Sequence, residues 1–160
     1  MLTGKVSNLL FFKKLYETAI LPTKGSEYAA GLDLYANNHA GMDTDKGWTL
    51  IIQPNETVKV GTGLAVEIPN GFFGGIYARS GLATKQGLRP ANCTGIIDAD
   101  YRGELIVALH NDSGVPQTIH GGDRIAQLIV QPYLDVTPEF VTDLSDTDRG
   151  EGGFGSTGTN

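Results

Sequence analysis

Apolar residues recur at every second position along much of this 160-residue chain, which is the period of a β-strand with one buried face. Prolines and glycine-containing pairs such as Asn70-Gly71 and Gly121-Gly122 divide these runs into short pieces. The pattern predicts strands over residues 9–16, 31–36, 48–53, 56–68, 72–78, 104–111, 117–120 and 124–134. Many short strands at this spacing favour a sandwich, a jelly roll or a barrel.

One segment has the pattern of a helix. We predict that Ser80 caps this helix, that it continues through Gln86 and that it ends at Gly87. Residues 37–48 are polar and carry two glycines and two aspartates. We expect them to form a solvated surface loop rather than an insertion that binds a partner or lies at a subunit edge.

Length and composition narrow the class of protein. The length suits one domain, and a net charge of −6 argues against broad nucleic-acid binding, which needs a basic face. Cys93 is the single cysteine, so we expect no internal disulfide and no cysteine-built zinc site, and we expect Cys93 to be buried. The apolar run 9–12 is too short for a signal sequence or a membrane span, which predicts an intracellular, cytoplasmic protein, or a nuclear or host-cell one if eukaryotic or viral.

Residues 149–158 form a glycine-rich tail with one arginine, one aromatic ring and two hydroxyls. The spacing of a phosphate-binding loop is present, but the lysine that such a loop needs before Ser156-Thr157 is missing. We therefore predict a flexible lid over residues 149–160 that closes on a nucleotide bound to a β domain at 1–148. Arg149 would meet phosphate charge, and Phe154 would stack on a flat ring.

Asp98 and Tyr101 lie in an Asp-Ala-Asp-Tyr-Arg-Gly segment between apolar residues and the predicted strand that starts near residue 104. We expect a hairpin turn here, because aspartate and glycine are ordinary turn residues. The alternative is chemical: a carboxylate at a strand edge can hold and deprotonate a water molecule, and Tyr101 offers a flat face to a sugar.

Two further segments suggest phosphate binding. Arg79 and Ser80 bring a guanidinium and a hydroxyl to the start of the predicted helix, where a plain N-cap is the alternative. Gln127 can donate to an oxygen, whereas we expect Arg124 to form a structural pair with Asp123.

Asp33 is an isolated aspartate inside an apolar strand, so it needs a cationic partner such as Arg79. The histidines at 39, 110 and 120 lack the spacing of metal ligands, and we interpret them as incidental.

Taken in order, five segments resemble the five motifs of the homotrimeric dUTP pyrophosphatases, or dUTPases. They cover residues 30–35, 78–83, 95–103, 122–128 and 149–158. The resemblance runs from about residue 29 to residue 158. It has two departures: Ala78 stands where the family commonly has proline, and the polar segment 37–48 is longer than is typical of the family.

This resemblance implies an all-β, jelly-roll-like subunit with one short helix and a flexible C-terminal tail, in a homotrimer whose active sites are shared between subunits. The implied reaction is Mg²⁺-dependent hydrolysis of dUTP to dUMP and pyrophosphate, by water attack on the α-phosphorus. Such a reaction limits uracil in DNA and supplies dUMP for dTMP synthesis. No nucleic acid or membrane partner is implied, although a protein partner stays open.

The resemblance also implies roles for individual residues. Asp98 would activate the water, Tyr101 would pack under the deoxyribose, and Asn92 with the backbone of Gly95 and Ile97 would read the uracil edge. The phosphates would be held by Arg79, Ser80, Gly81 and Gln127, and the tail would add Arg149, Phe154, Gly155, Ser156 and Thr157. Asp33 would give structural support, and Mg²⁺ would be held by phosphates and water rather than by protein ligands.

Two alternatives stay open. The dCTP deaminases share this fold but resemble the site with a second serine in place of Gly81, and they would release ammonia from dCTP. A binding protein that uses nucleotide only as a switch would need no water-activating carboxylate.

Overall fold

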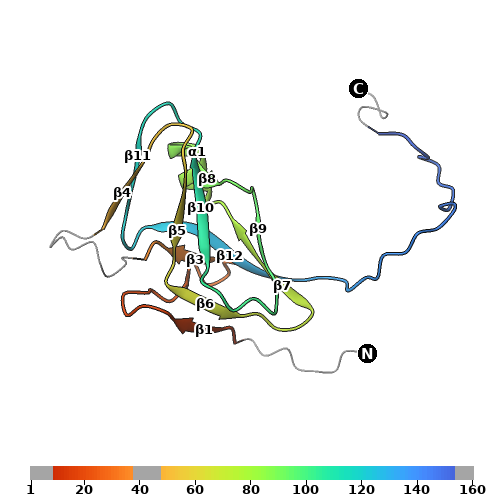
Figure 1. Ribbon diagram of the computed structural model, residues 1–160, viewed down its shortest axis with the longest axis horizontal. Helices are drawn as coiled ribbons and strands as arrows, with labels where there is room; N and C mark the ends of the chain where they lie inside the picture. The colour runs from red at the N-terminus through yellow and green to blue at the C-terminus, as the bar shows by residue number, and fades with distance from the viewer. Residues whose placement is uncertain (1–8, 38–47, 154–160) are drawn as a thin grey trace.

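The computed structural model describes residues 9–37 and 48–153, which form one helix and twelve short strands. These elements are β1 Phe11–Lys14, β2 Thr23–Lys24, β3 Leu32–Tyr35, β4 Thr49–Ile52, β5 Thr57–Gly61, β6 Leu64–Glu67, β7 Phe72–Tyr77, α1 Ser80–Gln86, β8 Leu88–Pro90, β9 Gly95–Ile97, β10 Ile106–Asn111, β11 Gln117–His120 and β12 Arg124–Pro132. The predicted all-β class with one short helix is confirmed (Figure 1). No helix among the described residues has the length and apolar character needed to cross a membrane.

All strand pairings in the described part of the chain are antiparallel. The largest sheet has the order β2-β3-β12-β7-β9, a second has β5-β10-β8, and β1-β6 and β11-β4 form two separate pairs. Strand β12 is central, since it pairs with β3 on one side and with β7 on the other. Asp33 of β3 lies directly opposite Gln127 of β12. The pairing of these strands therefore places segments some 90 residues apart in sequence next to one another.

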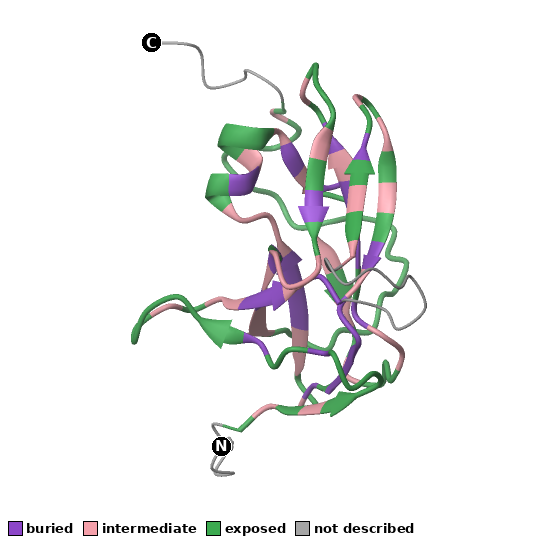
Figure 2. Ribbon diagram, turned by 90° about the vertical axis from the view of Figure 1, so that its left-hand side faces the viewer, coloured by how far each residue is buried: buried purple, intermediate pink, exposed green. Residues whose placement is uncertain are grey.

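The core lies between these sheets and follows the period of two seen in the sequence (Figure 2). In β10, Val107, Leu109 and Asn111 are buried, and the residues between them are more exposed. Leu34 of β3 and Leu128 of β12 are fully buried in the same cluster. Each such leucine stabilises the fold by about 1.5–3 kcal/mol relative to leaving it exposed.

The prediction of one strand over 56–68 is wrong, because the chain turns at Thr62 and Gly63. Gly63 has φ +71, and a Cβ there would lie 2.6 Å from the Asn37 side chain and 2.9 Å from Ala19. Strand β5 therefore pairs with β10, whereas β6 pairs with β1. Strands β2, β8 and β9 were not predicted, because two or three residues are too few to show a period.

The helix begins at Ser80 and ends before Gly87, as predicted, but its N-cap is a different residue. Gly87 is left-handed and donates its N–H to Leu82 O, as expected of a glycine C-cap. The N-cap is Arg79 in extended conformation, so the prediction of Ser80 as the cap is wrong. Cys93 is exposed in a turn with φ +61, which contradicts the expectation that it is buried. The loop expected over 37–48 lies for the most part outside the described residues.

Asn111 joins three segments in the interior. It is fully buried, its Nδ2 donates to Ile52 O at 3.0 Å and to Val115 O at 2.9 Å, and its Oδ1 accepts from Ser113 N at 2.9 Å. We expect Asn111→Ala to lower the free energy of unfolding by about 2–4 kcal/mol, because several buried polar groups lose their partner at once. Urea unfolding measures this, with Val115→Ala as a control at an exposed side chain in the same turn. A change no larger than in that control would contradict the prediction.

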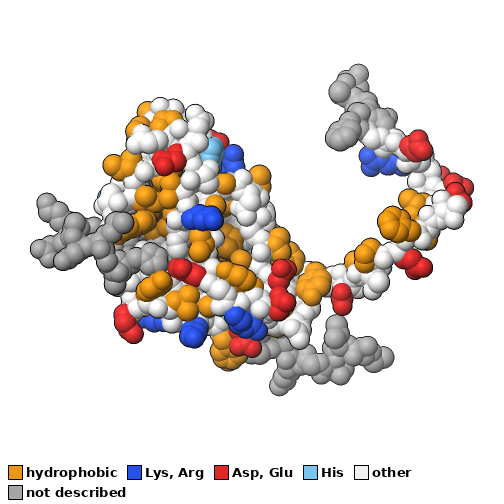
Figure 3. Space-filling model, in the orientation of Figure 1, with side chains coloured by type: hydrophobic (Ala, Val, Ile, Leu, Met, Phe, Trp, Pro, Cys, Tyr) orange, Lys and Arg blue, Asp and Glu red, His pale blue; other side chains and the backbone are white. Residues whose placement is uncertain are grey.

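After Pro132 the chain leaves the β body as an extended arm, residues 133–153, without helix or strand (Figure 1). Apolar and acidic side chains alternate along it (Figure 3). Leu134 and Leu144 are 81% and 88% exposed, and Phe140 is fully exposed. The arm therefore exposes large apolar side chains at several places along its length.

Candidate active site

One buried carboxylate ties together three segments that are far apart in sequence. Asp33, only 8% exposed, accepts from Arg79 Nε at 2.8 Å through Oδ1 and from Arg124 Nη1 at 3.1 Å through Oδ2. Arg79 also donates to Arg124 O at 3.3 Å. The predicted pairing of Asp33 with Arg79 is confirmed, because a carboxylate at this depth needs a cation.

The predicted pairing of Arg124 with Asp123 is wrong. Arg124 lies opposite Tyr35 in the pairing of β12 with β3, and its side chain reaches back along β3 to Asp33. Asp123 Oδ2 accepts from the backbone N–H of His120 at 2.7 Å. Asp123 therefore braces the turn between β11 and β12 instead of holding the arginine.

Gln127 connects β12 to the loop that leads into α1. Its Nε2 donates to Ala78 O at 2.9 Å. Gly31 makes room for this amide, since a Cβ at Gly31 would lie 2.5 Å from Gln127 Oε1. Three of the expected motifs, at 30–35, 78–83 and 122–128, thus meet at one place.

We expect Asp33→Asn to lower the free energy of unfolding by about 1–3 kcal/mol, because two arginines lose the charge that holds them. Thermal or urea unfolding measures the change. The matched control is Asp112→Asn, whose carboxylate also binds an arginine, Arg89, but is 44% exposed, and which should cost less than about 1 kcal/mol. Equal losses in the two variants would contradict the proposed importance of the buried pair.

Beside the Asp33 cluster lies a hollow of about 390 Å³, which we call the arginine hollow. Its lining comes from the start of α1, from β11 and from the β11–β12 turn: Arg79, Leu82, Gln86, Thr118, Ile119, His120, Asp123 and Arg124. Ser80 and Gly81 are exposed next to it, and a Cβ at Gly81 would meet no atom within 4 Å. The fold itself therefore does not require glycine at position 81.

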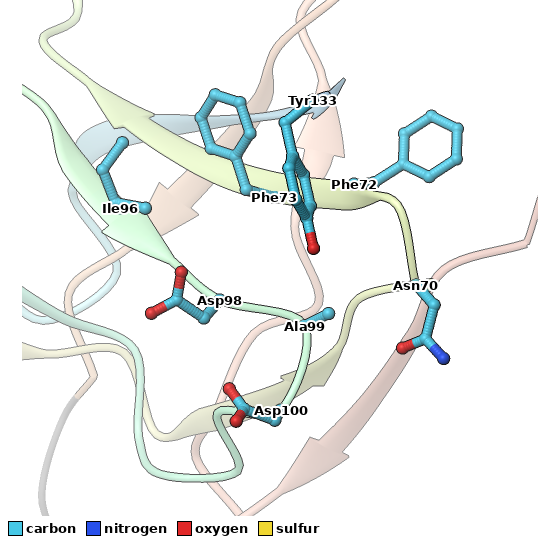
Figure 4. Close-up of a pocket in the computed structure, with 8 residues that line it drawn as sticks. All are labelled: Asn70, Phe72, Phe73, Ile96, Asp98, Ala99, Asp100 and Tyr133. Carbon is cyan, nitrogen blue, oxygen red and sulfur yellow. The ribbon is translucent and has the colours of Figure 1, made fainter. Parts of the chain in front are cut away.

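A second hollow, of about 640 Å³, surrounds Asp98, and we call it the Asp98 hollow (Figure 4). It is lined by Asn70, Phe72, Phe73, Ile96, Asp98, Ala99, Asp100 and Tyr133. Figure 4 shows the Tyr133 side chain pointing its hydroxyl toward the turn that carries the two carboxylates. Asp98 is exposed, and its carboxylate has no hydrogen-bond partner among the described residues, so it is open to water or a ligand.

The turn that carries Asp98 is braced on its far side. Tyr101 donates its N–H to Asp98 O at 3.1 Å and its hydroxyl to Glu104 O at 2.9 Å, and Arg102 Nη1 donates to Ala99 O at 2.7 Å. The prediction of a hairpin is wrong, because the strand before the turn, β9, pairs with β7, and the strand after it, β10, pairs with β5 and β8. A hairpin turn and a turn that joins two different sheets use the same residue types, so the sequence of this segment does not distinguish them.

The turn before β9 carries Asn92 at its exposed tip. A Cβ at Gly95 would lie 3.4 Å from Asn92 Nδ2, so this amide lies beside the start of β9. In the part of the chain that the structure describes, Gly95 and Ile97 pair on one side only, with β7, because β9 is the edge strand of its sheet. Backbone donors and acceptors on the other side of β9 are therefore available to a ligand.

The structure groups the expected site residues into two sets. Asp33, Arg79 and Gln127 meet beside the arginine hollow, with Ser80 and Gly81 next to it, while Asn92, Gly95, Ile97, Asp98 and Tyr101 lie along β9 and the turn after it. The two hollows share no lining residue. Arg149 lies in the arm, where its Nε donates to Gly152 O at 2.8 Å, and Phe154, Gly155, Ser156 and Thr157 lie outside the described residues.

Sequence reasoning missed Phe73, Tyr133 and His120 as lining residues. Phe73 and Tyr133 belong to apolar strand patterns, and nothing in such a pattern tells a core ring from a ring at a hollow. No residue at a metal-ligand or catalytic spacing marks His120 in the sequence, and only the folded structure shows that it lines a hollow with two arginines.

The sequence profile of the dUTPase family matches residues 17–158, which is most of the chain. The chain belongs to the dUTPase family. A curated relative, the deoxyuridine 5'-triphosphate nucleotidohydrolase of Hydrogenobaculum sp. (strain Y04AAS1), is 44% identical over 149 residues, covering 93% of this chain and 97% of the relative.

Solved dUTPases have the same fold. A mutant of the Staphylococcus bacteriophage 80alpha dUTPase with dUpNHpp superposes with a TM-score of 0.82 at 28% identity, covering 95% of this chain and 99% of that one. A mutant dUTPase of phage phi11 of S. aureus, described for its structural Mg(II) ion, gives a TM-score of 0.71 at 26% identity over 85% and 98% of the two chains. These dUTPase neighbours confirm the jelly-roll fold expected from the sequence.

Proposed function

We propose that this chain hydrolyses dUTP to dUMP and pyrophosphate by attack of water on the α-phosphorus. Membership of the dUTPase family and the names of its curated relatives support the substrate and the products. The observation that carries the mechanism is the Asp98 carboxylate, which is exposed, unpaired among the described residues and fixed on a braced turn.

In the proposed step, Asp98 orients a water molecule and accepts its proton as the water oxygen bonds to the α-phosphorus. The bond from that phosphorus to the oxygen bridging to the β-phosphate breaks, and pyrophosphate leaves. Phosphoryl transfer of this kind needs positioning and charge stabilisation rather than a covalent nucleophile. The proton passes from Asp98 to solvent to complete the cycle.

The base and the sugar would be selected along β9. The free edge of Gly95 and Ile97, together with the Asn92 amide, can hydrogen-bond the uracil edge, and cytosine would leave some of these groups unpaired. The Tyr101 ring would pack under the deoxyribose. Its hydroxyl is already held by Glu104 O, which keeps the ring in one place.

The arginine hollow suits the phosphates. Arg79 is held in position by Asp33, and Ser80, Gly81 and Gln127 lie next to it with hydroxyl, backbone and amide donors. From the tail, Arg149 with Ser156 and Thr157 would close on the outer phosphates, and Phe154 and Gly155 would cover the base.

The residues present fit a Mg²⁺ ion that arrives with the substrate. Among residues 9–37 and 48–153, no three His, Cys, Asp or Glu side chains are placed to hold a metal ion. Mg²⁺ keeps several waters and commonly binds substrate phosphates, so no dedicated protein ligands are needed. Bound in this way, it would neutralise charge on the triphosphate, and a phage dUTPase of this fold has a structural Mg(II) ion.

We further propose that the enzyme is a homotrimer whose active sites are shared between subunits. Two features support sharing. The Asp98 hollow and the arginine hollow have no lining residue in common, so two copies can each supply one of them to a single substrate. The arm exposes a row of apolar side chains that a neighbouring copy would cover.

Product analysis tests the proposal. The purified chain is incubated with Mg²⁺ and, separately, dUTP, dCTP, dTTP and UTP, and pyrophosphate and ammonia are followed. Pyrophosphate from dUTP alone is expected. Ammonia from dCTP would assign the chain a deaminase activity, and no product from any of the four would contradict an enzymatic role.

A further inference from the structure

His120 lines the arginine hollow together with Arg79 and Arg124. Its ring is oriented by Thr49, whose Oγ1 lies 3.1 Å from His120 Nδ1 across the β11–β4 pair. The other ring nitrogen, Nε2, has no hydrogen-bond partner within the described part of the chain. A histidine held by one nitrogen can present the second nitrogen to a ligand as an N–H donor.

Within residues 9–37 and 48–153, the charges around the arginine hollow cancel when His120 is neutral. Arg79 and Arg124 contribute two positive charges, and Asp33 and Asp123 contribute two negative charges. Among the described residues, the other polar side chains that contact His120 or line the hollow with it are neutral: Thr49 from β4, Thr118 from β11 and Gln86 from α1. Protonation of His120 therefore changes the formal charge of this group from zero to one positive charge.

His110 provides an internal comparison. It sits in the same cross-strand arrangement, with Thr57 Oγ1 at 2.8 Å from its Nδ1. Its Nε2, however, lies 3.3 Å from Asp112 Oδ1. Arg89 donates hydrogen bonds to the same carboxylate, and these raise the pKa of the Arg89 guanidinium. The second nitrogen of His110 is thus engaged by a carboxylate of the chain, whereas His120 lines a hollow of about 390 Å³ together with two arginines.

We propose that His120, when protonated, binds phosphate oxygens of the substrate in the arginine hollow, so that affinity for the triphosphate rises as the pH falls. The inference rests on the proposed function in one respect, which is that the anion is the triphosphate of dUTP. His120 acts on binding. Asp98 belongs to the other hollow, so removal of His120 raises KM and leaves kcat nearly unchanged.

The test measures the dissociation constant of dUpNHpp for the full chain, His120→Gln and His110→Gln at about pH 6 and about pH 8, on either side of the ordinary histidine titration. At the lower pH, His120→Gln should bind about three- to tenfold more weakly than the unaltered chain, as expected for one charge-assisted hydrogen bond. At the higher pH the two should bind alike. His110→Gln should follow the unaltered chain at both values.

Two additions separate charge from structure. His120→Lys keeps a positive charge at both pH values, so it should remove the pH-dependent difference and bind at least as tightly as the unaltered chain at the higher pH. Binding of dUMP, which lacks the outer phosphates, should change little between the unaltered chain and His120→Gln. Comparing proteins at the same pH cancels the titration of the ligand itself.

The proposal is overturned if His120→Gln binds dUpNHpp as tightly as the unaltered chain at both pH values. It is also overturned if the affinity of this variant falls by the same factor at both pH values, since equal losses indicate a structural role through Thr49. Hydrolysis of dUTP is measured in parallel, so that failure of this inference can be distinguished from failure of the proposed function. If dUTP is not hydrolysed, inorganic pyrophosphate replaces dUpNHpp in the same variants. A pyrophosphate affinity that is the same with and without His120, or absent, then overturns the inference.

Discussion

Asp98→Asn should bind dUpNHpp nearly as tightly as the unaltered chain and should hydrolyse dUTP with kcat lower by about 100-fold or more. Asparagine has the size of aspartate but cannot accept a proton from the attacking water. Because the side chain is exposed and has no partner among the described residues, the substitution should leave the fold and its unfolding temperature unchanged. Initial rates and binding of dUpNHpp measure the two parts of the prediction.

The matched control is Asp100→Asn, because Asp100 lines the same hollow two residues further along. It carries the same charge change in the same surroundings, so a general effect of charge would reduce kcat equally in both variants. We expect the large loss in Asp98→Asn only. Near-normal turnover in that variant would refute the role of Asp98 as the group that activates water.

Truncation after Asp148, which removes residues 149–160, should lower turnover of dUTP by about 100-fold. The deleted segment would supply Arg149 and the aromatic cover over the base. The unfolding temperature should not change, because the hydrogen bond described for the Arg149 side chain is to Gly152 in the deleted segment itself. Steady-state kinetics and thermal unfolding of the truncated chain measure both effects.

The truncated chain keeps arm residues 133–148, so size-exclusion chromatography should give the same assembly as for the full chain. A shorter truncation that removes only residues 159 and 160 is the control, since it leaves the tail motif at 149–158 intact, and it should retain full turnover. Unchanged kinetics after the longer truncation would contradict the lid.

The period-two strands were predictable wherever they are long enough to alternate, as in β10, where Val107 and Leu109 point inward and His110 does not. The partner of Asp33 was predictable as well, because a carboxylate inside an apolar strand needs a cation whatever the fold. The turn at Gly63 was not, since alternation continues through it. The positive φ of Gly63 and its close packing against Asn37 and Ala19, which together require a glycine, are features of the folded chain.

The site was predictable as a set of residues and not as an arrangement. The motif that holds Asp98 has a turn composition, but the pairing of β9 with β7 instead of β10 depends on contacts with residues about twenty positions away. The second partner of Asp33, Arg124, follows from the register of β12 on β3 in the same way. The sequence does not indicate that His120 belongs to the site, because the residues around it come from three different elements.

Asp33 accepts hydrogen bonds from Arg79, which precedes α1, and from Arg124, which begins β12. The contributions of these three residues to stability therefore depend on one another. Substitutions at residues 33, 79 and 124 are then non-additive: once the carboxylate is gone, changing either arginine costs less than it does alone. Among descendants of this chain the three positions are under a joint constraint, and a tolerated replacement at one of them will tend to follow a change at another.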